Sequence, residues 1–214
     1  MKNLLLAFST VFLLIACEKG KTDATKTTDK TDSATANSDW KPVDSATATK
    51  AWMEFATPGD MHKMLAKSDG NWTGENTMWM EEGGQPMKST SECTNKMIYG
   101  GRYQMSEHKG NMMGMPFEGM SITGYDNGKK KFVSTWIDNM GTGVMYMEGE
   151  WNAASKSIEF KGKMTDPARP GKDCDLREVY TFVDDNTQKL EMYGPGSKTG
   201  KEMKTMEILF TRKK

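Results

Sequence analysis

The sequence predicts a mainly β protein in which antiparallel strands close into an up-and-down barrel behind a short N-terminal helix. From Gly70 onward, apolar and polar residues alternate with the period of two that is typical of half-buried strands. Gly, Pro, Asn or Asp interrupt the alternation every eight to twelve residues or so, with no helical pattern between the interruptions. An open sheet of that width would leave two unpaired edges, so we expect closure. The ten runs are residues 70–81, 86–97, 101–109, 116–125, 130–138, 142–151, 156–164, 174–184, 187–193 and 202–212.

Short turn motifs support this division into strands. Asp126-Asn127-Gly128-Lys129 is a hairpin signal, because Asn and Gly readily adopt the positive φ angles of tight turns. Asn139-Met140-Gly141 and Asp184-Asp185-Asn186 indicate two further turns. A barrel of this size has an interior wide enough for a small ligand as well as for side chains.

The N-terminus has the pattern of a lipoprotein signal peptide. Lys2 precedes an apolar run, residues 4–15, which is shorter than the roughly twenty residues that span a bilayer. The run ends at Leu14-Ile15-Ala16-Cys17, which resembles the site where bacterial lipoproteins are cleaved and lipidated. We therefore expect residues 1–16 to be removed and Cys17 to be anchored by lipid to a membrane of the bacterial cell envelope. The alternative is an ordinary secretory signal in which the cysteine occurs by chance.

Composition divides the rest of the chain into three parts. Residues 17–40 are rich in Lys, Thr, Asp and Ser, which predicts a disordered tether. Residues 41–69 form a helical lead-in, and residues 70–214 form one barrel domain. The 29 basic residues balance the 29 acidic ones, so no broad positive field exists to attract nucleic acid.

One helical stretch stands out in the lead-in. Met61, Met64 and Leu65 have the spacing of a single apolar stripe on a helix. Asp60 precedes them as a helix cap, while His62 lies off the stripe and is expected to face solvent.

Two cysteines and many methionines remain in the folded part. Cys93 and Cys174 either form a disulfide, as an oxidising compartment permits, or stay as two unpaired thiols. The chain has 20 methionines. Thioethers suit Cu(I), which makes Met112, Met113 and Met115 candidates for a metal site. Methionine is also a flexible core filler, and because leucine is scarce here we favour that role.

Several motifs resemble a known family. Gly70-Asn71-Trp72-Thr73-Gly74 resembles the G-x-W-x-G opening of calycin-like barrels, in which the tryptophan closes the barrel floor. The other motifs are Gly100-Gly101-Arg102-Tyr103, Met115-Pro116-Phe117-Glu118-Gly119, Gly124-Tyr125-Asp126-Asn127 and Trp136-Ile137-Asp138-Asn139-Met140-Gly141-Thr142-Gly143. Together, over residues 58–193, they resemble DUF1579, a bacterial family of uncharacterised function.

This resemblance implies a calycin-like barrel but no particular reaction. The nitrobindins share a similar opening and bind haem through a histidine on a late strand. Residues 188–193 and 202–212 contain no histidine, so we expect no haem and no other cofactor. No catalytic triad, phosphate-binding loop or metal-ligand cluster is recognisable, and we expect no enzymatic activity.

Strand alternation selects candidate ligand-binding residues. Phe132, Ser134, Trp136 and Asp138 share one face of a predicted strand, and aromatic rings with a few polar groups are typical of a ligand cavity. A buried guanidinium paired with carboxylates would anchor an anionic or amide-bearing ligand. Arg102 joins Trp136 as a first candidate, because it follows two glycines that permit close backbone approach. The alternative is that these polar residues form surface pairs or a structural ion pair. Further candidates within the strands are Glu118, Tyr125, Arg177, Glu178 and Tyr193.

These observations predict a membrane-anchored envelope lipoprotein whose barrel binds a small, partly apolar ligand. A methionine-rich lipoprotein that handles Cu(I) is one alternative. A structural or interaction module of the envelope, with a filled core and no ligand, is the other.

Overall fold

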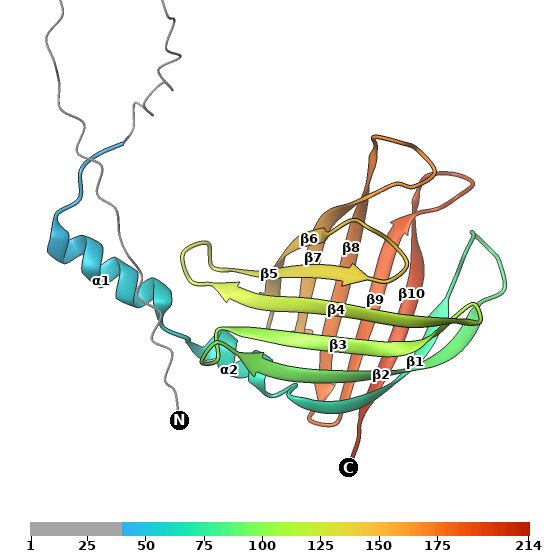
Figure 1. The fold of residues 1–214 in the computed structure, drawn as a ribbon, viewed down its shortest axis with the longest axis horizontal. Coiled ribbons are helices and arrows are strands. Elements are labelled where there is room, and N and C mark those ends of the chain that lie inside the picture. Colours follow the sequence, from blue (N-terminus) through green and yellow to red (C-terminus); the bar gives the residue numbers. More distant parts are fainter. Residues whose placement is uncertain (1–39) are drawn as a thin grey trace, which may run out of the picture. The chain divides into compact units, whose positions relative to one another are not determined.

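Ten antiparallel strands follow one another around a closed barrel in the computed structural model, which describes residues 40–214 (Figure 1). Each strand pairs with the next along the chain, and the last pairs with the first to close the wall. The predicted mainly β fold, strand number and up-and-down order are confirmed, whereas the predicted signal peptide and Cys17 lie outside the described residues. The strands are β1 (Gly70–Met78), β2 (Met87–Ile98), β3 (Tyr103–Met112), β4 (Met115–Asp126), β5 (Lys131–Asp138), β6 (Met145–Asn152), β7 (Ser157–Thr165), β8 (Asp173–Asp184), β9 (Thr187–Pro195) and β10 (Glu202–Arg212).

The two ends of the barrel have different connections. One end, called the floor here, has short turns, and the hairpin predicted at Asp126 is among them. The Asp126 carboxylate accepts hydrogen bonds from the backbone N–H groups of Gly128 and Lys129, at 2.8 and 2.9 Å. The other end, called the mouth, has longer loops, at residues 79–86, 139–144, 166–172 and 196–201.

Two helices precede the barrel, α1 (Ser45–Ala56) and α2 (Asp60–Ala66). The Asp44 carboxylate caps α1 by accepting hydrogen bonds from the backbone N–H groups of Ala46 and Thr47. No residue of α1 is buried. Its end is held by Asn127, whose side-chain amide donates to the carbonyl oxygens of Phe55 and Thr57, at 3.0 and 2.8 Å.

Neither helix could cross a membrane, since no helix among residues 40–214 is both long and apolar enough. Instead, α2 contributes to the barrel core. Leu65 is buried in one cluster with Phe132, Met147, Ile158 and Phe160.

His62 corrects one prediction, because it is buried rather than facing solvent. Its Nδ1 atom accepts a hydrogen bond from the backbone N–H of Gly59 at 3.0 Å, and this bond closes the first turn of α2. The ring also packs edge-on against Tyr125. The helical spacing of Met61, Met64 and Leu65 therefore did not predict that His62, off this stripe, is buried as well.

Ser68, just after α2, is the centre of the hydrogen bonds that close the floor. Its carbonyl oxygen accepts from the indole Nε1 of Trp72 at 2.9 Å and from the side-chain amide of Asn95 at 3.1 Å. Its hydroxyl accepts from the side-chain amide of Gln188 at 2.7 Å. Strands β1, β2 and β9 are thereby joined to one residue, which is only 1% exposed.

Arg212 completes the floor from the far end of the chain. Its guanidinium carbon lies 4.2 Å from the centre of the Trp72 ring, a distance that permits a cation–π interaction. The same guanidinium donates at 2.6 Å to the carbonyl oxygens of Lys67 and Asp69. The floor-closing role that the resemblance implied for Trp72 is thus present in the structure.

We predict that Trp72→Ala lowers the free energy of unfolding by about 3–5 kcal/mol, because it deletes a fully buried ring and one of the two hydrogen bonds to the Ser68 carbonyl. Urea denaturation followed by circular dichroism measures this change. Trp52→Ala is the matched control: Trp52 is 66% exposed on α1, and its loss should change stability by no more than about 0.5 kcal/mol. Equal losses in both variants would contradict the role assigned to Trp72.

Candidate ligand-binding cavity

The barrel encloses a cavity of about 1020 Å³. Its deep wall includes Leu65 of α2, and its rim includes Met80, Thr142 and Pro167 from three different mouth loops. The interior is therefore not filled by side chains, and the cavity is reached from the mouth. Its volume lies at the upper end of the range typical of small-molecule sites.

Opposite walls of the cavity differ in chemistry. Strands β2 to β5 contribute mostly hydroxyl and amide groups, whereas β6 to β10 contribute mostly thioethers, aliphatic chains and aromatic rings. The cavity is therefore amphipathic across its width. The polar wall includes Ser89, Ser91, Asn95, Gln104, Ser106, Ser121, Thr123 and Ser134. The apolar wall includes Met145, Met147, Ile158, Phe160, Leu176, Tyr180, Phe182, Leu190, Met192, Met206, Ile208 and Phe210.

Trp136, the first aromatic candidate from the sequence, lines the cavity near the mouth. Its ring stacks on Phe117 at an interplanar angle of 17° and a centroid distance of 6.2 Å. Its Nε1 donates to the Asp138 carboxylate at 2.6 Å, so the two candidates on this face of β5 act together. Gly119 on β4 makes room for the indole, because any Cβ at that position would overlap the ring.

His108 and Cys93 form a pair that sequence reasoning missed. They are cross-strand neighbours on β3 and β2, with the cysteine Sγ 3.6 Å from the imidazole Nε2. Burial lowers the pKa of His108 to about 4 and raises the pKa of the Cys93 thiol to about 12. Both groups are therefore neutral at physiological pH, which disfavours nucleophilic chemistry by the thiol. The alternation of Gln104, Ser106 and His108 was the available signal.

Glu178 is a carboxyl group in the apolar wall. Its cross-strand neighbours are Phe160 on β7 and Met192 on β9. Burial alone raises the pKa of Glu178 to about 7, with no hydrogen bond or charged neighbour among the causes. The side chain retains some accessible surface because it borders the cavity.

The remaining candidates do not line the cavity, which corrects the expectation of a buried guanidinium. Arg102 is exposed in the turn between β2 and β3, where it donates to the carbonyl oxygen of Tyr99 at 3.1 Å. Arg177 lies on the outside of β8, 2.7 Å from Glu202, with its guanidinium carbon 3.9 Å from the centre of the Tyr193 ring.

Two further candidates, Glu118 and Tyr125, also lie outside the cavity lining. Glu118 is exposed on β4, 3.7 Å from Lys109. Tyr125 packs against Phe132 and His62 in the core next to α2, with ring centroids 5.0 and 6.0 Å away. Glu118, Arg177 and Tyr193 therefore form surface pairs, which was the alternative to a role in ligand binding.

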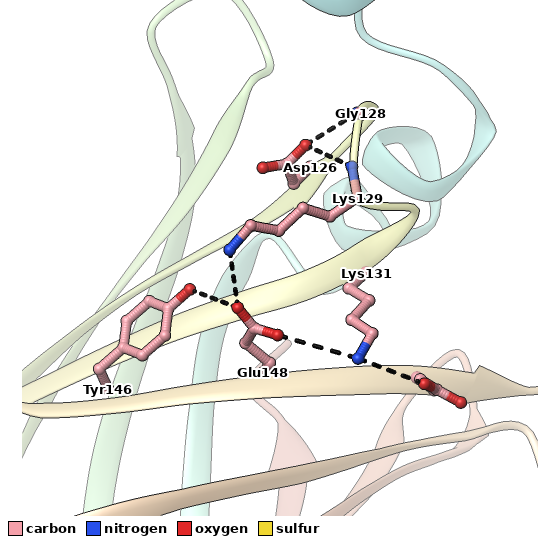
Figure 2. Close-up of polar contacts among 7 residues, drawn as sticks. Asp126, Gly128, Lys129, Lys131, Tyr146 and Glu148 are labelled. Atoms are coloured by element: carbon pink, nitrogen blue, oxygen red, sulfur yellow. Dashed lines mark hydrogen bonds and ion pairs between the residues drawn. The ribbon is translucent and has the colours of Figure 1, made fainter. Parts of the chain in front are cut away.

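Charged side chains at β5 and β6 also pair with one another on the outside of the barrel, around Glu148 (Figure 2). Lys129 and Tyr146 both donate to one oxygen of Glu148, at 2.8 and 3.1 Å. Lys131 approaches the other oxygen at 3.8 Å. Ionic pairs of this kind are solvated surface interactions, and they contribute little to a binding site inside the barrel.

Cys93 and Cys174 are both free, so the disulfide that was one of the two alternatives is not formed. Three strands separate β2 from β8 in the wall, whereas a disulfide requires Cα atoms within about 7 Å. The alternative of two unpaired thiols is therefore the one observed.

The methionine candidates separate in the structure. Met112 borders the cavity, whereas Met113 and Met115 are 59% and 48% exposed on the hairpin between β3 and β4. Within residues 40–214, no group of three or more His, Cys, Asp or Glu side chains is placed to hold a metal ion. Most cavity methionines occupy positions where a strand faces inward, which agrees with a role as apolar wall material.

We predict that iodoacetamide labels both Cys93 and Cys174 in urea without any reductant, as peptide mass spectrometry would show. In the native protein at pH 7.5, Cys174 should react first, because Cys93 is buried and its pKa is raised further. Recovery of a peptide in which the two cysteines are cross-linked would contradict the structure.

The described residues form a closed ten-stranded antiparallel β-barrel whose floor is sealed by Trp72. The chain belongs to the family described as protein of unknown function DUF1579, whose model matches residues 57–212. The fold is also similar to the crystal structure of Rv2717c from M. tuberculosis, with a TM-score of 0.55 and 10% sequence identity over 74% of this chain and 100% of that one. No curated protein shows significant sequence similarity to this chain.

Proposed function

We propose that this protein is a membrane-tethered barrel that binds a small, partly apolar ligand in its interior. The observation that carries the proposal is the amphipathic cavity of about 1020 Å³. A ligand with an apolar body would pack against the thioethers and rings of β6 to β10. Its polar groups would meet the hydroxyls and amides of β2 to β5.

The cavity argues against a purely structural role for the barrel. A protein that only needed a stable core would fill its interior, since each unfilled volume forfeits packing energy. Instead, glycine or serine occupies many inward positions on β2 to β5, such as Ser91, Ser106, Gly110 and Ser121. Small side chains there keep the space open.

The tether half of the proposal rests on the sequence around Cys17. A chain of about twenty residues at random-coil dimensions would span roughly 25 Å, which would hold the barrel clear of lipid headgroups while keeping it near the membrane. A mouth free to approach the bilayer or the solvent beside it suits exchange of a partly apolar ligand.

Binding of the neutral apolar dye N-phenyl-1-naphthylamine tests the cavity. We expect saturable fluorescence enhancement, with Kd in the micromolar range or about −8 kcal/mol. Ser106→Phe places a ring inside the cavity and should weaken binding at least about tenfold, or 1.4 kcal/mol. Glu107→Phe is the matched control, because the neighbouring side chain on β3 is exposed outside. Equal binding by both variants, or no saturable binding by the parent, would refute the proposal.

Metabolic labelling with a palmitate analogue in a bacterial host tests the tether. We expect the parent chain to incorporate the label and to fractionate with membranes, since several acyl chains on one residue anchor stably. Cys17→Ser should remove both properties, whereas Cys93→Ser should remove neither. Labelling that persists in Cys17→Ser would show that the anchor has been assigned to the wrong residue.

A further inference from the structure

Among the Asp, Glu, Lys and Arg side chains of residues 40–214, only acidic ones border the cavity. The lining contains Asp138 and Glu178, and no lysine or arginine from residues 40–214. This arrangement opposes the sequence-based expectation of an arginine anchor for an anionic ligand. We propose that the ligand is an apolar cation, an amine or quaternary ammonium compound with a hydrocarbon or aromatic body, and that Glu178 binds its charge. This inference rests on the proposed function.

The two carboxyl groups are not equivalent. Asp138 is already engaged: its oxygens accept from the Trp136 indole and from the backbone N–H groups of Met140 and Gly141, at 2.6, 2.9 and 3.1 Å. It therefore shapes the rim and orients Trp136. Glu178 has no such partners, and its carboxyl group reaches the cavity from the middle of β8. A ligand cation is the partner that this carboxyl group lacks.

The surroundings of Glu178 favour a cation with an apolar body over a strongly hydrated one. Phe160 and Tyr180 border the cavity beside it, and aromatic faces attract cations through their quadrupole. Met192, its other cross-strand neighbour, offers a polarizable thioether. An alkylammonium group loses less hydration than a metal ion on entering such a site, whereas a carboxylate would be repelled by Glu178 and would find no basic partner.

Charge in this cavity should change near neutral pH. The titratable side chains that border it are Cys93, His108, Asp138, Glu178 and Tyr180. Burial holds the pKa of His108 at about 4 and raises the pKa of Cys93 and Tyr180 well above neutrality. Burial also places the pKa of Glu178 at about 7. Because the carboxylate forms as pH rises through this value, affinity for a permanent cation should increase with pH.

Three ligands with the same ten-carbon chain provide the test: decyltrimethylammonium, 1-decanol and decanoate, each below its micellar concentration. Isothermal titration calorimetry of the full chain at pH 8.5 should show the ammonium compound binding at least about tenfold more tightly than decanol, with decanoate weakest. At pH 5.5, where Glu178 is protonated, the preference for the ammonium compound over decanol should fall to about threefold or less.

Glu178→Gln should abolish the pH dependence of this preference while retaining a side chain of nearly the same size. Glu159→Gln is the matched control, because Glu159 lies one strand away on the outer face, 2.9 Å from Lys161. The pH profile of the parent chain keeps the test decisive even if Glu178→Gln fails to fold. Equal binding of decanol and the ammonium compound at pH 8.5, or tighter binding of decanoate, would overturn the inference and leave the proposed function standing. Binding of none of the three would refute both.

Discussion

The contact between Arg212 and Trp72 is the interaction on which the rest of the structure depends. These residues are register partners on β10 and β1, so the guanidinium over the indole joins the last strand of the meander to the first. The same guanidinium holds the carbonyl oxygens just before β1, and the indole N–H holds Ser68. The contacts of Arg212 and Trp72 that join the two ends of the wall therefore also close the floor. With that end sealed, the cavity is reached from the mouth, whose loops form its rim.

The chain keeps this interior open by the choice of side-chain size on opposite walls. Serines and glycines on β2 to β5 take little volume, whereas methionines and rings on β6 to β10 provide contact area. Glycines also permit close approach where large groups face each other: Gly119 accommodates Trp136, and Gly149 accommodates Phe160. The abundance of methionine follows from this architecture. A flexible thioether can adjust to a ligand in a way that a packed leucine cannot.

The sequence predicted the wall of the barrel better than it predicted which residues face inward. A period of two with turn residues at regular intervals determines strands and hairpins locally, and it placed Trp136 and Asp138 together correctly. The same alternation could not decide between Arg177 and Glu178, because neighbours always point to opposite faces and the inward face depends on closure. The apolar set Leu176, Tyr180 and Phe182 shares its face with Glu178, and this was the signal that could have resolved the choice. The bounds of α1 were not predicted within the helical lead-in, and no residue of this helix is buried.

The position of Glu178 has a physical implication that fold stability alone does not explain. A carboxyl group against phenylalanine and methionine costs desolvation energy, and its raised pKa means that the folded state loses stability as pH rises from about 4.5, the ordinary value, to about 7. A leucine or glutamine at that position would avoid the penalty. The outward residues of the barrel show that the chain has ample basic groups for pairing, yet none of those in the described segment lines the cavity. A group that weakens the fold and lacks an internal partner is best explained by a partner that arrives from outside, with the opposite charge.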